Sequence, residues 1–172
     1  FAWTLKGMGD ALEIGTFVEN AVGASASASL LLPAILFLVA IFLAFSTGTS
    51  WGTFAILVPI ATAMFPGTDK LEMMIISVSA VLAGAVCGDH VSPISDTTVM
   101  SSAGAQSNHI NHVTTQMQYA AVVAVVCFIG YIIAGVSQSW WIALGSSLVI
   151  LLVVLTVMKR LFASREKKRV AA

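Results

Sequence analysis

Long apolar runs dominate this chain and alternate with short polar interruptions. A helix needs about 20 mostly apolar residues to cross the roughly 30 Å of hydrocarbon in a bilayer. The runs 119–135 and 140–158 are apolar almost throughout, and a short link at 136–139 joins them next to Trp140 and Trp141. Because tryptophan favours the membrane–water interface, residues 119–158 predict two antiparallel transmembrane helices.

A longer apolar stretch, residues 30–66, is interrupted in its middle. As a single helix its 37 residues would measure about 55 Å, which is too long for one crossing. Residues 46–50 read Ser-Thr-Gly-Thr-Ser and divide the stretch into two arms of about 16 residues each. The pattern predicts an interrupted helix pair, either a re-entrant helical hairpin or two spans with a tight turn. Irregular backbone at membrane depth is tolerated only where protein buries it or where it lines a wet cavity.

A second interrupted segment covers residues 71–118. Its first part, 71–86, is apolar, and its last part, 99–118, is polar on much of its surface. Between them lies Pro93, which removes a backbone donor and disfavours helix at the residue before it. We therefore expect a transmembrane helix that breaks at 88–98 and restarts with a hydroxyl or the Asp96 carboxylate as its cap.

The two ends of the chain differ in character. Glycines interrupt residues 1–29, which we interpret as the end of a truncated span followed by a loop. Because the chain opens on an apolar phrase without an initiator Met or a charged signal sequence, we expect a fragment of a longer protein. Residues 159–172 hold six of the eight Lys and Arg residues. A basic tail after an apolar run predicts a cytoplasmic C-terminus, although such a charge run is also typical of nucleic-acid or anionic-lipid patches.

Composition agrees with the apolar pattern. The chain is 58% hydrophobic and 9% charged, whereas soluble domains carry about 25% charged residues. We therefore predict an all-α integral membrane protein in contact with lipid, placed in a bacterial inner membrane and without a nucleic-acid partner. Nucleophile elbows, phosphate loops, zinc-binding Cys pairs and dinucleotide fingerprints are absent from the sequence. These absences argue against an enzyme and give no reason to expect a cofactor.

Two carboxylates stand out within the apolar region. Asp89 and Asp96 are the only acidic residues between Glu72 and Glu166. A charged side chain at the bilayer centre costs roughly 2.5–3.5 kcal/mol, so a residue that persists there is a functional hypothesis. A carboxyl group away from water holds its proton more readily, and a bound cation opposes this effect. A site that holds either a proton or a cation, but not both, would couple the two flows.

Hydroxyl groups surround both interruptions. Na⁺ is a hard cation and prefers oxygen ligands, which unwound helix segments supply in transporters. For any one hydroxyl, the alternative is that it only caps or bridges helices. We interpret the histidines at 109 and 112 as part of a solvated polar helix rather than a metal site. The candidate Na⁺ ligands are Asp89, Asp96, Ser92, Ser95, Thr97, Thr98, Thr47, Thr49 and Ser50; the candidate proton-binding groups are Asp89, Asp96 and His90, since histidine titrates near physiological pH.

Several phrases of the sequence carry a family resemblance. Residues 47–53 (Thr-Gly-Thr-Ser-Trp-Gly-Thr) and 88–98 (Gly-Asp-His-Val-Ser-Pro-Ile-Ser-Asp-Thr-Thr) resemble the NhaC family of Na⁺/H⁺ antiporters. Residues 101–105 and 108–113 are similar to the same family, whereas 5–15 match it weakly. The resemblance implies a secondary antiporter that exchanges Na⁺ for H⁺. It also implies two inverted-topology repeats, of which this chain would be one half.

The same resemblance sets the expected partners and the alternatives. The missing N-terminal half of the same protein would be a partner that contributes further ligands, and a homodimer is compatible with it. Related transporters use a re-entrant hairpin followed by a broken helix, which is the order expected here. Some relatives exchange organic anions such as malate and lactate, or amino acids, so a cation-coupled organic-anion antiporter is an alternative. A non-transporting structural subunit of a membrane complex is the alternative from another class.

Overall fold

The computed structural model describes residues 26–65 and 70–170, together with positions 4, 7, 8, 11–13 and 17. Most of the predicted truncated span and loop at 1–29 therefore lies outside the described residues. The described part of the chain is helical, without strands, and its six principal helices are α3 (Ala26–Thr47), α4 (Ser50–Ala63), α5 (Leu71–Val91), α6 (Asp96–Gly104), α7 (His109–Ser137) and α8 (Trp140–Val170).

Four of the described helices are long and apolar enough to cross a membrane. They cover Ser29–Thr47, Leu71–Val91, His109–Ser137 and Trp140–Arg160. The prediction of an all-α membrane protein is therefore confirmed. The remaining apolar helix, α4, has 14 residues, which corresponds to about 21 Å and is shorter than the hydrocarbon thickness.

The first interruption is a tight turn between α3 and α4. Gly48 has a φ of +69°, a conformation that glycine adopts without steric cost. Thr49 then caps α4, its hydroxyl accepting from the backbone N–H of Gly52 at 3.4 Å. The two arms are unequal, since α3 has 22 residues and α4 has 14. The Ala- and Ser-containing stretch before residue 30 continues as helix and lengthens the first arm.

The second interruption divides α5 from α6. Helix α5 ends at Val91, and Ser92 has extended backbone (φ −71°, ψ 129°), as expected for a residue before proline. The expected side-chain cap is wrong: Ser95 occupies the N-cap position of α6 but makes no side-chain cap hydrogen bond, because its hydroxyl bonds to Asp89 instead. Asp96 is the first residue of α6 and not its cap.

Helix α7 begins ten residues before the apolar run at 119. Asn108 caps it by accepting from the backbone N–H of Asn111 at 3.1 Å, so the polar residues 109–118 form the first turns of the spanning helix itself. Helix α8 likewise continues past the apolar run into the basic segment and ends at Val170.

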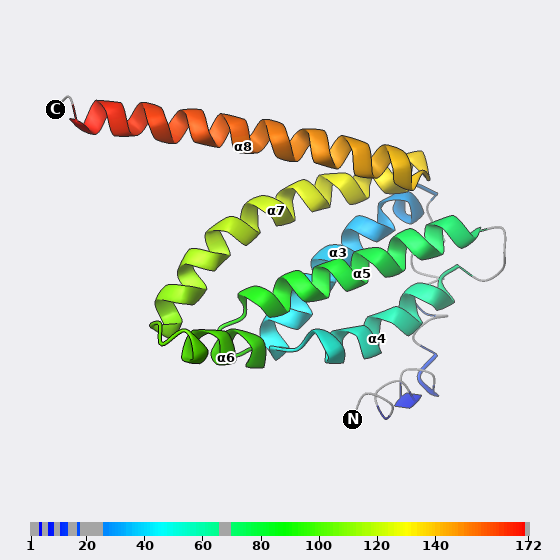
Figure 1. Cartoon of the computed structure of the whole chain (residues 1–172). Coiled ribbons are helices and arrows are strands. Elements are labelled where there is room, and N and C mark those ends of the chain that lie inside the picture. Colours follow the sequence, from blue (N-terminus) through cyan, green and yellow to red (C-terminus); the bar gives the residue numbers. More distant parts are fainter. Residues whose placement is uncertain are drawn as a thin grey trace.

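Among the described helices, α3 and α5 share the most extensive contact and form the core of the bundle. Gly84 and Gly88 of α5 lie against α3, where an added Cβ would overlap the carbonyl oxygens of Phe37 and Ile41. Small residues of this kind let helix backbones approach closely in membranes. The α3–α4 turn, the α5–α6 break and the start of α7 gather at one end of the bundle (Figure 1). This arrangement brings the two polar interruptions together.

Candidate functional site

The two interruptions are in direct contact. The Ser92 hydroxyl donates to the carbonyl oxygen of Phe45 at 2.7 Å. Phe45 lies in the last turn of α3, where carbonyl groups lack intrahelical partners, so Ser92 satisfies an acceptor that the helix leaves open. At Gly48 an added Cβ would lie 2.9 Å from the carbonyl oxygen of Ile94. The absence of a side chain at Gly48 therefore allows the turn to pack on the break.

Asp89 occupies the junction between these segments. Its Oδ1 accepts from the Ser95 hydroxyl at 2.6 Å, and its Oδ2 accepts from the Ser50 hydroxyl at 3.0 Å. Asp89 is half-buried, whereas Ser50 and Ser95 are 8% and 0% exposed. Hydrogen bonds to an ionised carboxylate are stronger than those between neutral groups. Each oxygen of the Asp89 carboxylate receives one such hydroxyl hydrogen bond.

A third hydroxyl extends this network to the surface. The Thr97 and Ser95 hydroxyls lie 2.8 Å apart, and Thr97 is exposed. Ser95 has a single hydroxyl proton, which is directed at Asp89. Thr97 must then be the donor to Ser95, which leaves the Asp89 carboxylate at the end of a polarised chain of hydroxyls.

Two helix N-termini add to the electrostatics of the site. Ser50 is the first residue of α4, and Ser95 is the N-cap residue of α6. Both therefore present the positive end of a helix dipole toward the carboxylate to which their hydroxyls donate. This arrangement suits a negative charge at Asp89, which lies in an otherwise mostly apolar helix.

The structure separates the predicted site hydroxyls into two groups. Ser50, Ser95 and Thr97 join Asp89 in one network. The other hydroxyls bond to backbone groups: Thr47 donates to Leu43, Thr49 caps α4, Ser92 donates to Phe45 and Thr98 donates to His90. Of the remaining candidates, Asp96 and His90 are exposed, and Asp96 lies in the first turn of α6, where the helix dipole favours a negative charge.

The sequence did not predict the contacts that His109 makes with the α5–α6 break and with α6. Its Nε2 lies 2.7 Å from the carbonyl oxygen of Pro93 and its Nδ1 lies 2.9 Å from the Ser102 hydroxyl. Interpreting His109 as part of a solvated helix face was therefore wrong, because its half-buried ring contacts the break. The cap at Asn108 was the available signal, since it places His109 at the start of a helix, next to the preceding turn.

The side-chain atoms of the Asp89 network that could bind a cation are all oxygens. Among the residues that the structure describes, no group of three or more His, Cys, Asp or Glu side chains could hold a metal ion. One carboxylate with neighbouring hydroxyls suits a weakly held hard cation such as Na⁺ better than a transition metal, which prefers imidazole or thiolate ligands.

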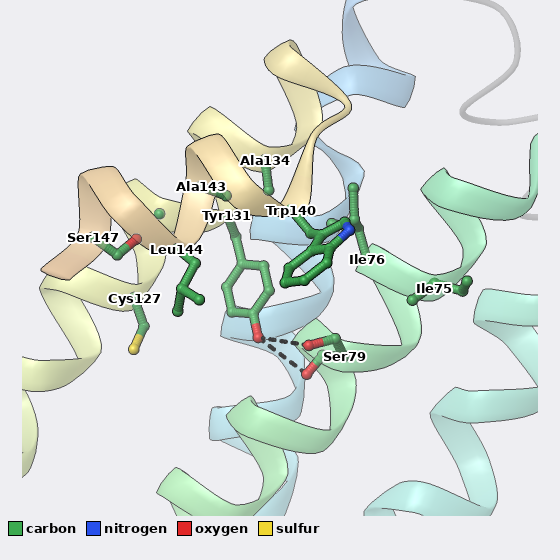
Figure 2. A pocket seen from close by; sticks show the side chains of 11 residues that line it. Ile75, Ile76, Ser79, Cys127, Tyr131, Ala134, Trp140, Ala143, Leu144 and Ser147 are labelled. Carbon is green, nitrogen blue, oxygen red and sulfur yellow. Dashed lines mark hydrogen bonds between the residues drawn. The ribbon is translucent and has the colours of Figure 1, made fainter.

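A cavity of about 340 Å³ lies elsewhere, between α5, α7 and α8. Figure 2 shows Tyr131 reaching across it to Ser79, with its hydroxyl 3.1 Å from the Ser79 carbonyl oxygen and 3.2 Å from the Ser79 hydroxyl. The lining is mostly apolar and includes no carboxylate. This cavity therefore lacks the ligands that a cation site needs.

Comparison with known proteins decides the class of this chain. The sequence model of the Na⁺/H⁺ antiporter family matches residues 1–136. The chain belongs to the Na⁺/H⁺ antiporter family. Both helix interruptions and the Asp89 network lie within the matched residues, whereas α8 lies beyond them. Membership of the Na⁺/H⁺ antiporter family and the four apolar helices together indicate an integral membrane protein.

One curated relative is similar to nearly the whole of this chain but is itself much longer. It is described as an uncharacterized protein of Haemophilus influenzae, and it is 46% identical to the chain over 160 residues. The alignment covers 93% of this chain but 30% of the relative. No solved structure matches the chain.

Proposed function

We propose that this chain forms part of an NhaC-type Na⁺/H⁺ antiporter and that Asp89 is the group that exchanges Na⁺ for H⁺. One observation carries the proposal: both oxygens of a half-buried carboxylate accept hydroxyl hydrogen bonds, one from each of the two helix interruptions. Such unwound segments provide the ion ligands in many secondary transporters.

The exchange follows from the capacity of a single carboxylate. When Asp89 is ionised, the hydroxyls of Ser50 and Ser95 can rotate so that their lone pairs face a bound Na⁺. When a proton binds Asp89, the negative charge that attracts Na⁺ is lost. Because Asp89 holds one cation or the other, loading it from opposite faces of the membrane couples Na⁺ movement to H⁺ movement.

The wider architecture belongs to the same proposal. We place α3 and α4 as a re-entrant hairpin and α5 and α6 as the broken helix of one inverted repeat, with the C-terminus in the cytoplasm of a bacterial cell. The other half of the protein would complete the ion site. The short length of α4 and the contact between the two interruptions support this arrangement.

The test uses the full-length protein in everted membrane vesicles. Asp89→Asn keeps the shape of the side chain but cannot hold a proton or a negative charge, so we expect Na⁺-dependent proton flux to be abolished. Glu72→Gln is the matched control, because Glu72 is an exposed acid in the first turn of the same helix. Full exchange in the Asp89→Asn vesicles would contradict the proposal.

A second candidate is a cation-coupled antiporter of organic anions. The observation that favours it is the meeting of the α4 and α6 N-termini at the site, since helix N-termini attract carboxylate groups. Adding malate, lactate and Na⁺ separately to the vesicles distinguishes the candidates. Proton flux driven by malate or lactate would favour the organic-anion antiporter, whereas no flux with any of them would favour a structural subunit.

A further inference from the structure

His109 contacts the α5–α6 break through the backbone of Pro93. Its Nε2 lies 2.7 Å from the carbonyl oxygen of Pro93. A carbonyl oxygen can only accept, so Nε2 carries the proton of this hydrogen bond. The link joins His109, the first residue of α7, to Pro93, which lies 16 positions earlier in the sequence.

The segment 92–95 is therefore held from two sides. On one side the Ser92 hydroxyl donates to Phe45, and the carbonyl of Ile94 packs on Gly48. On the other side His109 holds the carbonyl of Pro93. Within the segment the Ser95 N–H donates to the Ser92 carbonyl oxygen at 3.4 Å, which is a long hydrogen bond. Outside contacts therefore fix its conformation.

The second ring nitrogen of His109 fixes the position of α6. Its Nδ1 lies 2.9 Å from the Ser102 hydroxyl. Ser102 is 3% exposed, and its hydroxyl also lies 2.9 Å from the carbonyl oxygen of Val99. One imidazole ring at the start of α7 thus contacts both the break, which contains Ser95, and α6, which begins at the next residue.

We infer that His109 is a positioning residue for the ion site, holding segment 92–95 so that the Ser95 hydroxyl stays directed at Asp89. Pro93 precedes Ser95 by two residues, and Ser95 is fully buried with its hydroxyl 2.6 Å from Asp89. A rotation of the peptide groups at 93–95 would withdraw that hydroxyl. This inference rests on the proposed function of Asp89 but concerns a side chain that does not contact the carboxylate.

Three substitutions at one position isolate the Pro93 contact. In His109→Gln the amide nitrogen occupies the place of Nε2 and can still donate to the Pro93 carbonyl. In His109→Asn the shorter amide reaches only the place of Nδ1, toward Ser102. His109→Ala removes both contacts. His112→Ala is the control, because His112 lies on the same helix face and makes a longer, exposed contact of 3.4 Å to Ser101.

Two measurements on the full-length protein test the inference. We expect the apparent KM for Na⁺ to rise about fivefold in the Asn and Ala variants at nearly unchanged maximal rate, since the hydrogen bond to the Pro93 carbonyl is lost. We expect the Gln variant to keep the wild-type KM. Hydrogen–deuterium exchange of a peptide covering 92–98 should accelerate in the same two variants and not in Gln or in His112→Ala. A Gln variant that behaves like Ala, or an Asn variant that behaves like wild type, would overturn the inference.

The two measurements can refute the proposed function and the role of His109 independently of each other. If wild-type vesicles show no Na⁺/H⁺ exchange but deuterium uptake still follows the Asn–Gln pattern, the proposed function falls and the link from His109 to the break stands. If exchange is present but deuterium uptake at 92–98 is the same in all variants, the role of His109 is refuted and the function stands.

Discussion

The hydroxyl of Ser50 lies 3.0 Å from Oδ2 of Asp89, although 39 positions separate the two residues in the sequence. This contact joins the first residue of α4 to the last turn of α5. A hydroxyl directly after the α3–α4 turn therefore contacts the carboxylate itself. Substitution of Ser50 therefore tests the site from outside the helix that carries Asp89.

We expect Ser50→Ala to raise the apparent KM for Na⁺ about tenfold while leaving the protein folded, because a hydrogen bond to a charged group contributes about 1.5–3 kcal/mol. The Na⁺ dependence of proton flux in everted vesicles measures this. Ser46→Ala is the control, since the exposed Ser46 hydroxyl donates only to Leu43 at 3.0 Å. An unchanged KM in Ser50→Ala would exclude Ser50 from the ion site.

Asp96 should prove less important than Asp89. It is exposed in the first turn of α6, where its charge interacts with a helix dipole by about 0.3–1 kcal/mol. We therefore expect Asp96→Asn to reduce Na⁺-dependent proton flux by a few-fold rather than to abolish it. Complete loss of flux in vesicles that contain normal amounts of Asp96→Asn protein would instead make Asp96 an essential ligand.

Gly88→Ala should separate α3 from α5. The added Cβ would overlap the carbonyl oxygen of Ile41 and lie 3.0 Å from the Cβ of Ala44. Overpacking of this kind costs about 1–3 kcal/mol, so we expect a lower thermal unfolding midpoint of the purified protein and slower exchange, because Asp89 is the next residue. Gly145→Ala is the control, since nothing lies within 4 Å of its added Cβ. Equal midpoints for the two variants would refute close packing at Gly88.

Tyr131→Phe should weaken the fold slightly and spare exchange. The substitution removes the contacts between the Tyr131 hydroxyl and Ser79, and side-chain hydrogen bonds between membrane helices contribute about 0.6 kcal/mol on average. We expect a small decrease in the unfolding midpoint and a wild-type KM for Na⁺. A raised KM would show that the cavity in Figure 2 communicates with the ion site.

The sequence predicted the fold from features that depend on composition and local backbone chemistry. The helix break follows from Pro93, and the α3–α4 turn follows from the run of small residues around Gly48. The start of α7 at His109 was harder to predict, because polar residues that are compatible with helix give no apolar signal. The apolar run marks where a helix enters lipid and not where the helix begins.

The site was predictable only as a set of residue types. Asp89 stood out because a carboxylate in an apolar region needs an explanation. The sequence could not tell Ser95, which donates to Asp89, from Ser92, which donates to a backbone carbonyl. The two serines lie three positions apart in one loop, and rotations of the loop backbone decide which of them reaches the carboxylate. The Asn108 cap marks the start of α7 at His109, but the tertiary contact of His109 with Pro93 could not be read from it.

The close packing that Gly48 allows, because glycine has no side chain, also constrains how the protein can move. Because the turn and the break are packed backbone against backbone and joined by Ser92 and Ser50, they cannot slide past each other without breaking both hydrogen bonds. We expect the two interruptions to travel as one rigid body when access to Asp89 alternates between the faces of the membrane.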